Sequence, residues 1–132
     1  MSETIAKAVH DFNAKLIYYG LSGSHMILEA KKIGLHTASE VFSDRTYQHD
    51  GSLTSRSDER ALIHDESSVL KQVLLMIKEG KVETVDKTLI PIHAETICMH
   101  GDGKFALRFA QAIHQRLKQE SITLQSIQSS TQ

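Results

Sequence analysis

The sequence alternates between segments of helical periodicity and short apolar runs, and this alternation restricts the fold more than any other feature. In the helical segments apolar residues recur every three or four positions, whereas the strand-like runs are continuously apolar. We expect helices at 3–13, from Ser22 or Ser24 to about 33, at 66–79 and at 105–117, and strands at 15–19, 36–42, 96–99 and 122–124, with a hairpin at 81–89. Strands that alternate with helices form βαβ units, so the sequence predicts an α/β fold with mostly parallel strands.

The size and the charge balance are those of one ordinary globular domain. The chain has 132 residues, of which 40% are hydrophobic and 23% charged, and its formal net charge is −1. We expect a single domain over residues 1–125 and a polar, frayed tail over 126–132. A chain without a basic stripe is not expected to bind nucleic acid. A chain without a run of about 18 apolar residues is not expected to cross a membrane.

The start of the chain and its cysteine content favour a cytoplasmic protein. Residues 1–4 are polar and acidic, so no signal peptide is predicted. Cys98 is the only cysteine, which excludes an intramolecular disulfide and a zinc site built on several cysteines. It lies in an apolar run, and we interpret it as a small buried residue rather than as a nucleophile.

Two polar clusters follow strands of the predicted sheet. One runs from Glu40 to Tyr47, at the end of the strand at 36–42, and the other runs from His100 to Gly103, directly after 96–99. In parallel α/β folds, ligands bind beyond the carboxyl ends of the strands. The polar stretch at 43–65 is also long for a loop in a compact domain, which is typical of functional or disordered segments.

The first cluster offers carboxylates and a cation. Glu40 lies near the end of a strand, where a carboxylate that faces a pocket can act as a base or hold a cationic group. Arg45 has the planar fork that binds a carboxylate or a phosphate. The alternative is a surface loop in which Asp44 caps a turn and Arg45 points into solvent.

The second cluster combines an imidazole with a flexible backbone. His100 can exchange a proton near neutral pH. Gly101 and Gly103 allow close approach of a ligand to the backbone, and free N–H groups at the start of the next helix can hold an anion. Asp102 either orients His100 or caps the helix, and the alternative is a plain strand–turn–helix junction in which Asp102 is the N-cap.

Two further patterns are incomplete matches to a catalytic or a metal-binding motif. The segment 20–24 resembles the turn that carries a serine nucleophile but lacks its final glycine. The eight histidines are scattered and no pair has the His-x-x-x-His spacing of a zinc site. We therefore assign no metal ligand, and a metal site built from distant segments stays open.

Three stretches match a known pattern in order along the chain. Residues 37–47 (TASEVFSDRTY) resemble A-x-E-V-F-A-D-R-x-Y, residues 50–56 (DGSLTSR) resemble D-G-x-L-V-x-R, and residues 96–102 (TICMHGD) resemble T-I-C-V-H-G-D. Together they resemble the LamB/YcsF family over nearly the whole chain. Members of that family are roughly twice as long, and motifs of their N-terminal half are absent here. The chain therefore resembles the C-terminal half.

The resemblance implies one half of an irregular (β/α) barrel of the glycoside hydrolase/deacetylase type. It implies ATP-dependent hydrolysis of 5-oxoproline to L-glutamate, with ATP as co-substrate and 5-oxoprolinase subunits B and C as partners. It also implies catalytic roles for Glu40, Asp44, His100 and Asp102, and roles in holding the substrate carboxylate or phosphate for Arg45, Tyr47, Arg56, Gly101 and Gly103.

A half barrel has free strand edges and an apolar inner face, which invite association. The leading hypothesis is an enzyme fragment that is inactive alone. It is a decayed copy, pairs with a separate N-terminal half, or associates with itself. The rival hypothesis is a non-catalytic binding or regulatory module that docks onto the B and C subunits or binds a small anion.

Overall fold

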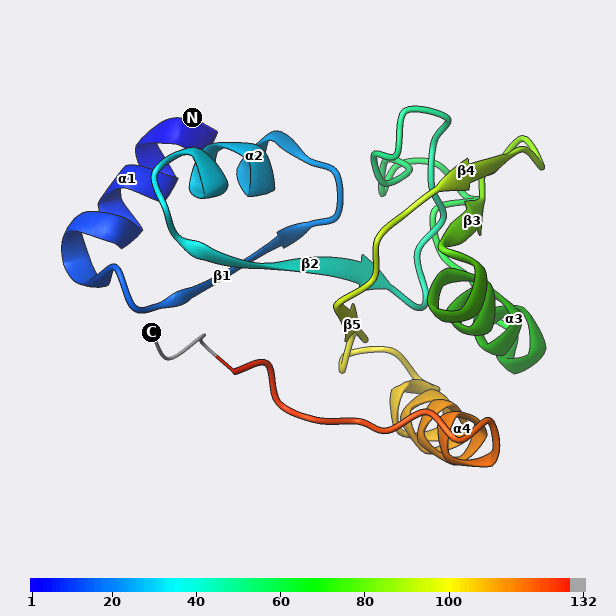
Figure 1. Ribbon diagram of the computed structural model, residues 1–132. Helices are drawn as coiled ribbons and strands as arrows, with labels where there is room; N and C mark the ends of the chain where they lie inside the picture. The colour runs from blue at the N-terminus through cyan, green and yellow to red at the C-terminus, as the bar shows by residue number, and fades with distance from the viewer. Residues whose placement is uncertain (129–132) are drawn as a thin grey trace.

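Three parallel strands form the sheet at the centre of the molecule (Figure 1). The computed structural model describes residues 1–128. Strands β1 (Ile17–Leu21), β2 (His36–Phe42) and β5 (Thr96–Cys98) lie in the order β1-β2-β5, and both pairings are parallel. The prediction of an α/β fold with parallel strands is confirmed, and β2 has the predicted bounds.

Two helices cover one side of β1 and make the first lobe of the molecule (Figure 1). Helix α1 (Ser2–Asn13) packs on α2 (His25–Lys32). The small core of this lobe consists of Ala6, Tyr18, Ala30 and Leu35. Gly20 lets α2 lie close to β1, because a β-carbon at this position would be 3.2 Å from Cδ1 of Ile27.

Strand β1 differs from its prediction at both ends. It begins at Ile17 rather than at residue 15, and it continues through Gly20 to Leu21 rather than ending at residue 19. The chain leaves α1 through a turn in which Oδ1 of Asn13 accepts the Lys15 N–H at 2.9 Å and the Asn13 carbonyl accepts the Leu16 N–H at 3.1 Å. Because the turn uses these backbone groups, pairing with β2 starts only at Ile17.

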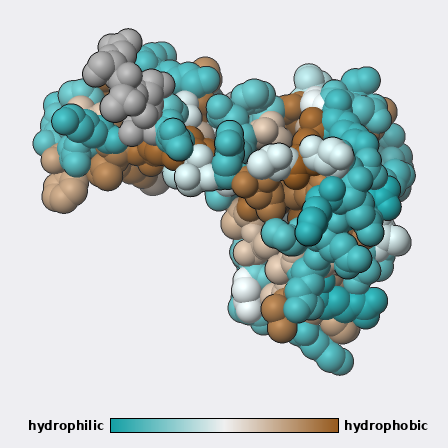
Figure 2. All heavy atoms as spheres, turned by 60° about the horizontal axis from the view of Figure 1, so that its bottom comes forward, coloured by the Kyte–Doolittle hydropathy of each residue, from teal (hydrophilic) through white to brown (hydrophobic). Residues whose placement is uncertain are grey.

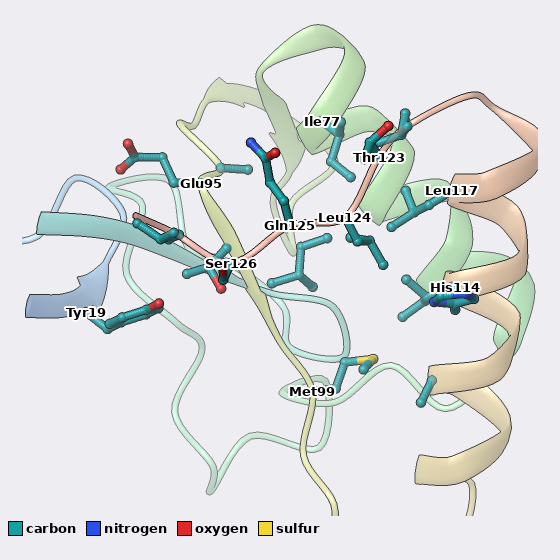
Figure 3. Close-up of a pocket in the computed structure, with 17 residues that line it drawn as sticks. Tyr19, Ile77, Glu95, Met99, His114, Leu117, Thr123, Leu124, Gln125 and Ser126 are labelled. Carbon is teal, nitrogen blue, oxygen red and sulfur yellow. The ribbon is translucent and has the colours of Figure 1, made fainter. Parts of the chain in front are cut away.

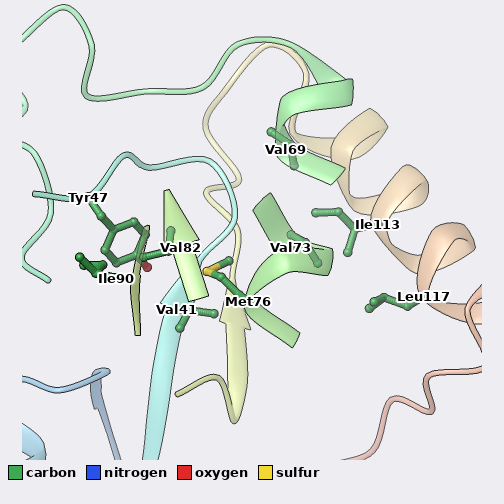
Figure 4. Packing of buried hydrophobic residues seen from close by; sticks show 9 residues of the cluster. All are labelled: Val41, Tyr47, Val69, Val73, Met76, Val82, Ile90, Ile113 and Leu117. Atoms are coloured by element: carbon green, nitrogen blue, oxygen red, sulfur yellow. The ribbon is translucent and has the colours of Figure 1, made fainter. Parts of the chain in front are cut away.

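The second lobe consists of α3 (Glu66–Glu79), β3 (Lys81–Glu83), β4 (Leu89–Pro91) and α4 (Ala106–Gln119). Helix α3 has the predicted bounds, because Asp65 caps its first turn through the Ser68 N–H at 2.8 Å and Gly80 ends it with a φ of 61°. Strands β3 and β4 pair antiparallel and form the predicted hairpin, which extends to Pro91 rather than ending at residue 89. The core of this lobe, drawn in Figure 4, contains Val41, Tyr47, Val69, Val73, Met76, Val82, Ile90, Ile113 and Leu117.

The polar stretch between β2 and α3 is a folded loop attached to the second lobe. Tyr47 forms isolated β-bridges with Leu53 and Thr84, and Arg45 forms one with Leu62. The Thr54 N–H also donates to the Thr46 carbonyl at 3.0 Å. These bridges and hydrogen bonds therefore fix the conformation of the loop next to the end of β2.

The predicted strand at 122–124 is wrong, because residues 122–128 have no regular secondary structure. A strand needs a neighbour, and within residues 1–128 no segment pairs with this one. Instead the chain turns at Ser121, with a φ of 58°, and the Ile122 N–H donates to the Leu117 carbonyl at 2.9 Å. Residues 129–132 of the predicted tail lie outside the described residues.

The two lobes leave a hollow between them, and apolar atoms are exposed there (Figure 2). Tyr19, Met99 and Leu124 are 46%, 40% and 56% exposed and line a groove on this side. Strands β1 and β5 each have one unpaired edge within the described part of the chain. The described residues therefore form an open sheet with an uncovered apolar side.

Candidate active site

The ends of β2 and β5 lie side by side. Phe42, the last residue of β2, pairs with Cys98, the last residue of β5. Ser43 extends this contact, because its backbone N–H and its hydroxyl donate to the Cys98 carbonyl oxygen at 3.1 and 3.2 Å. The parallel register thus brings the two polar clusters together at the carboxyl edge of the sheet, where ligands bind in such folds.

One pair of side chains joins the two clusters. Nδ1 of His100 lies 3.0 Å from Oδ1 and 3.1 Å from Oδ2 of Asp44. The two side chains are only 25% and 16% exposed, and the imidazole stacks on the ring of Phe42 with 5.7 Å between centroids. Limited exposure to water strengthens such a hydrogen bond. Asp44, rather than Asp102, therefore orients His100, and the pair can hold or move a proton.

Arg56 approaches the opposite nitrogen of the same imidazole. Its Nη2 lies 3.3 Å from Nε2 of His100. A guanidinium only donates, so Nε2 must accept, and the proton of the neutral ring lies on Nδ1 toward Asp44. Arg56 is exposed and has further N–H donors that an anion can use.

Glu40 lies two residues before Phe42 along β2, so their side chains point to the same side of the sheet. It is half-buried and pairs with Thr96 of β5. Burial raises the pKa of the Cys98 thiol, and the carboxylates of Glu40 and Asp44 raise it further. Two carboxylates and the thiol therefore share one region, and the raised pKa disfavours the thiolate that a nucleophilic cysteine needs.

Two of the residues predicted to bind the substrate, Arg45 and Tyr47, are buried inside the loop between β2 and α3. Nη2 and Nε of Arg45 donate to the carbonyls of Thr54 and Ala61 at 2.7 and 3.3 Å, so the alternative that Arg45 points into solvent is wrong. The fully buried Tyr47 accepts the Phe42 N–H at 2.8 Å through its hydroxyl, and burial raises its pKa to about 12. Neither side chain reaches the surface in this structure, and their roles in ligand binding stay predictions.

Gln72 is a residue of the site that we did not predict. Its Nε2 lies 3.0 Å from the Phe42 carbonyl, 3.3 Å from that of Ser43 and 2.9 Å from that of Arg45. Gln72 thus holds the segment that carries Asp44. The signal was visible in the sequence, because this amide interrupts the buried apolar stripe of α3 formed by Val69, Val73 and Met76.

The loop after His100 is exposed and less constrained. Helix α4 begins at Ala106 with Phe105 as its N-cap and no side-chain cap, so the prediction of Asp102 as N-cap is wrong. At Gly101 and Gly103 nothing lies within 4 Å of an added β-carbon. The backbone there is open to a ligand, and the binding role of the two glycines stays a prediction.

A groove of about 590 Å³ lies apart from these residues (Figure 3). It is bounded by β5, α4 and the segment 122–127, and Leu117 and Leu124 point into it. None of the predicted site residues lines it. The groove is therefore a feature of the open apolar side rather than part of the Asp44–His100 site.

Within residues 1–128, no three His, Cys, Asp or Glu side chains gather closely enough to hold a metal ion. In the same part of the chain, no helix has the length and apolarity needed to cross a membrane.

The model of the LamB/YcsF family matches residues 1–132. The chain belongs to the LamB/YcsF family. The A subunit of 5-oxoprolinase from Geobacillus kaustophilus (strain HTA426) is 52% identical to this LamB/YcsF chain over 126 residues, which are 96% of this chain and 49% of that protein. The A subunit of 5-oxoprolinase from Geobacillus thermodenitrificans (strain NG80-2) is 50% identical over 131 residues, or 99% of this chain and 51% of that protein.

The fold of the LamB/YcsF chain is similar to the crystal structure of a lactam utilization protein from Thermus thermophilus. The TM-score is 0.85 at 32% identity, and the match covers 96% of this chain and 50% of that one. The chain thus spans about half the length of the relatives that it matches. The family resemblance seen in the three sequence stretches is confirmed.

Proposed function

We propose that this LamB/YcsF chain supplies one wall of the active site of an ATP-dependent 5-oxoprolinase. The observation that carries the proposal is the contact between Asp44 and His100, with Arg56 on the far side of the imidazole. A proton-transfer pair next to an exposed arginine suits the hydrolysis of a small substrate that carries a carboxylate. The names of the relatives supply the substrate, 5-oxoproline.

The chemistry requires these groups because the five-membered lactam is an unreactive amide. Transfer of the terminal phosphoryl group of ATP to the lactam oxygen makes the ring carbon electrophilic. Water then adds to that carbon as a base takes its proton. The C–N bond breaks and the nitrogen is protonated, which leaves an acyl phosphate on the side-chain carboxyl group. A second water hydrolyses this acyl phosphate to L-glutamate and phosphate, and ADP is released from the first step. In this proposal Asp44 and His100, with Glu40 beside them, move the protons and position the water.

The remaining predicted residues would bind the substrate or shape the site around it. Arg56 would hold the substrate carboxylate or the phosphate, because it is exposed and has N–H donors that do not contact the imidazole of His100. The open backbone at Gly101 and Gly103, with Asp102 between them, would form the adjoining wall. Arg45 and Tyr47 would act indirectly, because their hydrogen bonds fix the loop that carries Asp44.

We further propose that residues 1–125 are one half of an irregular (β/α) barrel of the deacetylase type. Two observations support this: β1 and β5 have unpaired edges within the described chain, and the relatives are about twice as long. A polypeptide with the remaining half would close the sheet and supply the rest of the site. Subunits B and C would complete a cytoplasmic enzyme, and this chain alone would be inactive.

One observation favours a second candidate, a non-catalytic binding module that docks onto the partner subunits. The Asp44–His100 pair lines neither of two cavities of about 590 and 510 Å³, and enzyme sites for small molecules are concave. Such a module would bind 5-oxoproline or a nucleotide without turnover.

The test is ATP-dependent release of glutamate from 5-oxoproline. The chain is assayed with B and C subunits, with and without a polypeptide that carries the other half of a LamB/YcsF protein. We expect turnover only when the other half is present. Turnover without it would refute the claim of inactivity, and binding without turnover in the complete mixture would favour the binding module.

A further inference from the structure

We propose that Arg56 masks the Nε2 lone pair of His100, and that an anionic group, a carboxylate or a phosphate, unmasks it by drawing Arg56 away. The inference rests on the proposed site and deepens it. It makes the proton acceptor of the site available only when an anion is bound. Arg56 is thus a positioning residue that also senses the ligand.

Only one ring nitrogen of His100 is free of a carboxylate. Nδ1 is bound to Asp44 at 3.0 and 3.1 Å, and the ring lies against Phe42. A flipped ring would lose the hydrogen bond to a carboxylate that is only 16% exposed. Proton uptake by the neutral imidazole must therefore occur at Nε2.

Arg56 contacts this nitrogen, Nε2. The contact between Nη2 and Nε2 is 3.3 Å long and joins an exposed guanidinium to a neutral acceptor. A lone pair that accepts an N–H from a cation cannot at the same time accept a proton from water. In this arrangement Asp44 orients the imidazole, and Arg56 covers the ring nitrogen that does not face Asp44.

Arg56 is held by fewer hydrogen bonds than the other two arginines of the loop, Arg45 and Arg60. Arg45 is buried and donates to two backbone carbonyls. Arg60 forms two hydrogen bonds with the Asp58 carboxylate, at 2.8 and 3.1 Å. Within residues 1–128, the hydrogen bond found for the Arg56 guanidinium is the one to His100.

An anion is a stronger partner for Arg56 than the imidazole of His100 is. A guanidinium binds a carboxylate or a phosphate through two parallel charge-assisted hydrogen bonds, each roughly twice as strong as a neutral one. The imidazole offers one long contact instead. An anion near the site therefore binds the guanidinium of Arg56 and draws it away from His100. Nε2 of His100 can then accept a hydrogen bond from a nearby water.

The experiment reads the imidazole directly in the full chain. In protein labelled with nitrogen-15, long-range proton–nitrogen spectra at about pH 8, where histidine side chains are mostly neutral, distinguish protonated from unprotonated ring nitrogens. The spectrum of His100→Gln assigns the resonances of His100. Without phosphate we expect the proton on Nδ1, and we expect inorganic phosphate to move the Nε2 resonance along a saturable curve. Potassium chloride at equal ionic strength should not.

Two variants complete the test. In Arg56→Met, Nε2 should already lie near its phosphate-saturated position, and phosphate should move it no further. The matched control Arg60→Met removes an arginine of the same loop that is bound to Asp58, and it should behave as the wild type does. A proton on Nε2 in the absence of phosphate, no saturable shift, an equal shift with chloride, or an equal shift in Arg56→Met would each overturn the proposal. Because no turnover is measured, either result leaves the oxoprolinase proposal to its own assay.

Discussion

The side-chain amide of Gln72 lies 3.0 Å from the carbonyl oxygen of Phe42 and so connects helix α3 to the last residue of β2. The same nitrogen approaches the carbonyls of Ser43 and Arg45, which flank Asp44. An amide nitrogen has two hydrogens, so the three carbonyls share them. The position of Asp44 therefore depends on a residue that follows it by 28 positions in the sequence.

Replacement of Gln72 should destabilise the fold. Gln72→Leu leaves buried carbonyls without their donor, and we expect the free energy of unfolding to fall by about 1–3 kcal/mol. Urea unfolding measures this. The matched control is Gln115→Leu on the exposed side of α4, which should change the stability by no more than about 0.5 kcal/mol. Equal stability of the two variants would contradict the role given to Gln72.

Tyr47 should make the stability sensitive to alkaline pH. Burial raises its pKa from 10.0 to about 12, so the folded state favours the neutral phenol. This contribution is complete below pH 10 and is lost as the pH rises through about 12. We expect Tyr47→Phe to lose less stability than the wild type over that window. At neutral pH the variant should be less stable by about 1–3 kcal/mol, because the Phe42 N–H loses its acceptor.

The measurement is urea unfolding at neutral pH and at alkaline pH for both proteins. Tyr19→Phe is the control, because Tyr19 is 46% exposed and should not alter the pH dependence. Parallel loss of stability in the wild type and in Tyr47→Phe would show that the buried phenol does not carry the effect.

A side chain at Gly20 should destabilise the fold. A β-carbon there would lie 3.2 Å from Cδ1 of Ile27 and 3.3 Å from Cβ of Met26, both on α2. Gly20→Ala should therefore lower the stability by about 1–3 kcal/mol through overpacking. Gly103→Ala is the control for thermal unfolding, because nothing lies within 4 Å of an added β-carbon there. A Gly20→Ala protein as stable as the control would mean that α2 can move away from β1.

The fold was predictable where local signals agree with the packing. Helix α3 has a capping aspartate, an apolar stripe and a terminal glycine, so its bounds follow from the sequence. The predicted end of the first strand at residue 19 is wrong, because Gly20 lies inside β1, where its lack of a side chain lets α2 pack closely. The segment 122–124 has the apolar residues of a strand, but pairing depends on a neighbour that local sequence does not reveal.

The candidate site was predictable in its location but not in its contacts. The register of β2 with β5 places Asp44 next to His100, and a parallel sheet makes that proximity expected. The choice of Asp44 rather than Asp102 as the partner of His100 depends on the course of two loops, which residue spacing does not fix. The burial of Arg45 follows from the fold of the loop between β2 and α3, to which its polarity gives no guide.

Asp44→Asn tests most directly whether the Asp44–His100 pair moves protons in the hydrolysis of 5-oxoproline. The variant is assayed for ATP-dependent glutamate release in the complete mixture of chain, complementary half and partner subunits. Asparagine keeps the shape but removes the charge that orients the imidazole, so we expect turnover to fall by roughly 10²–10⁴-fold. The matched control Asp58→Asn, in the same loop and paired with Arg60, should retain activity. Turnover by Asp44→Asn equal to that of the wild type would contradict the account.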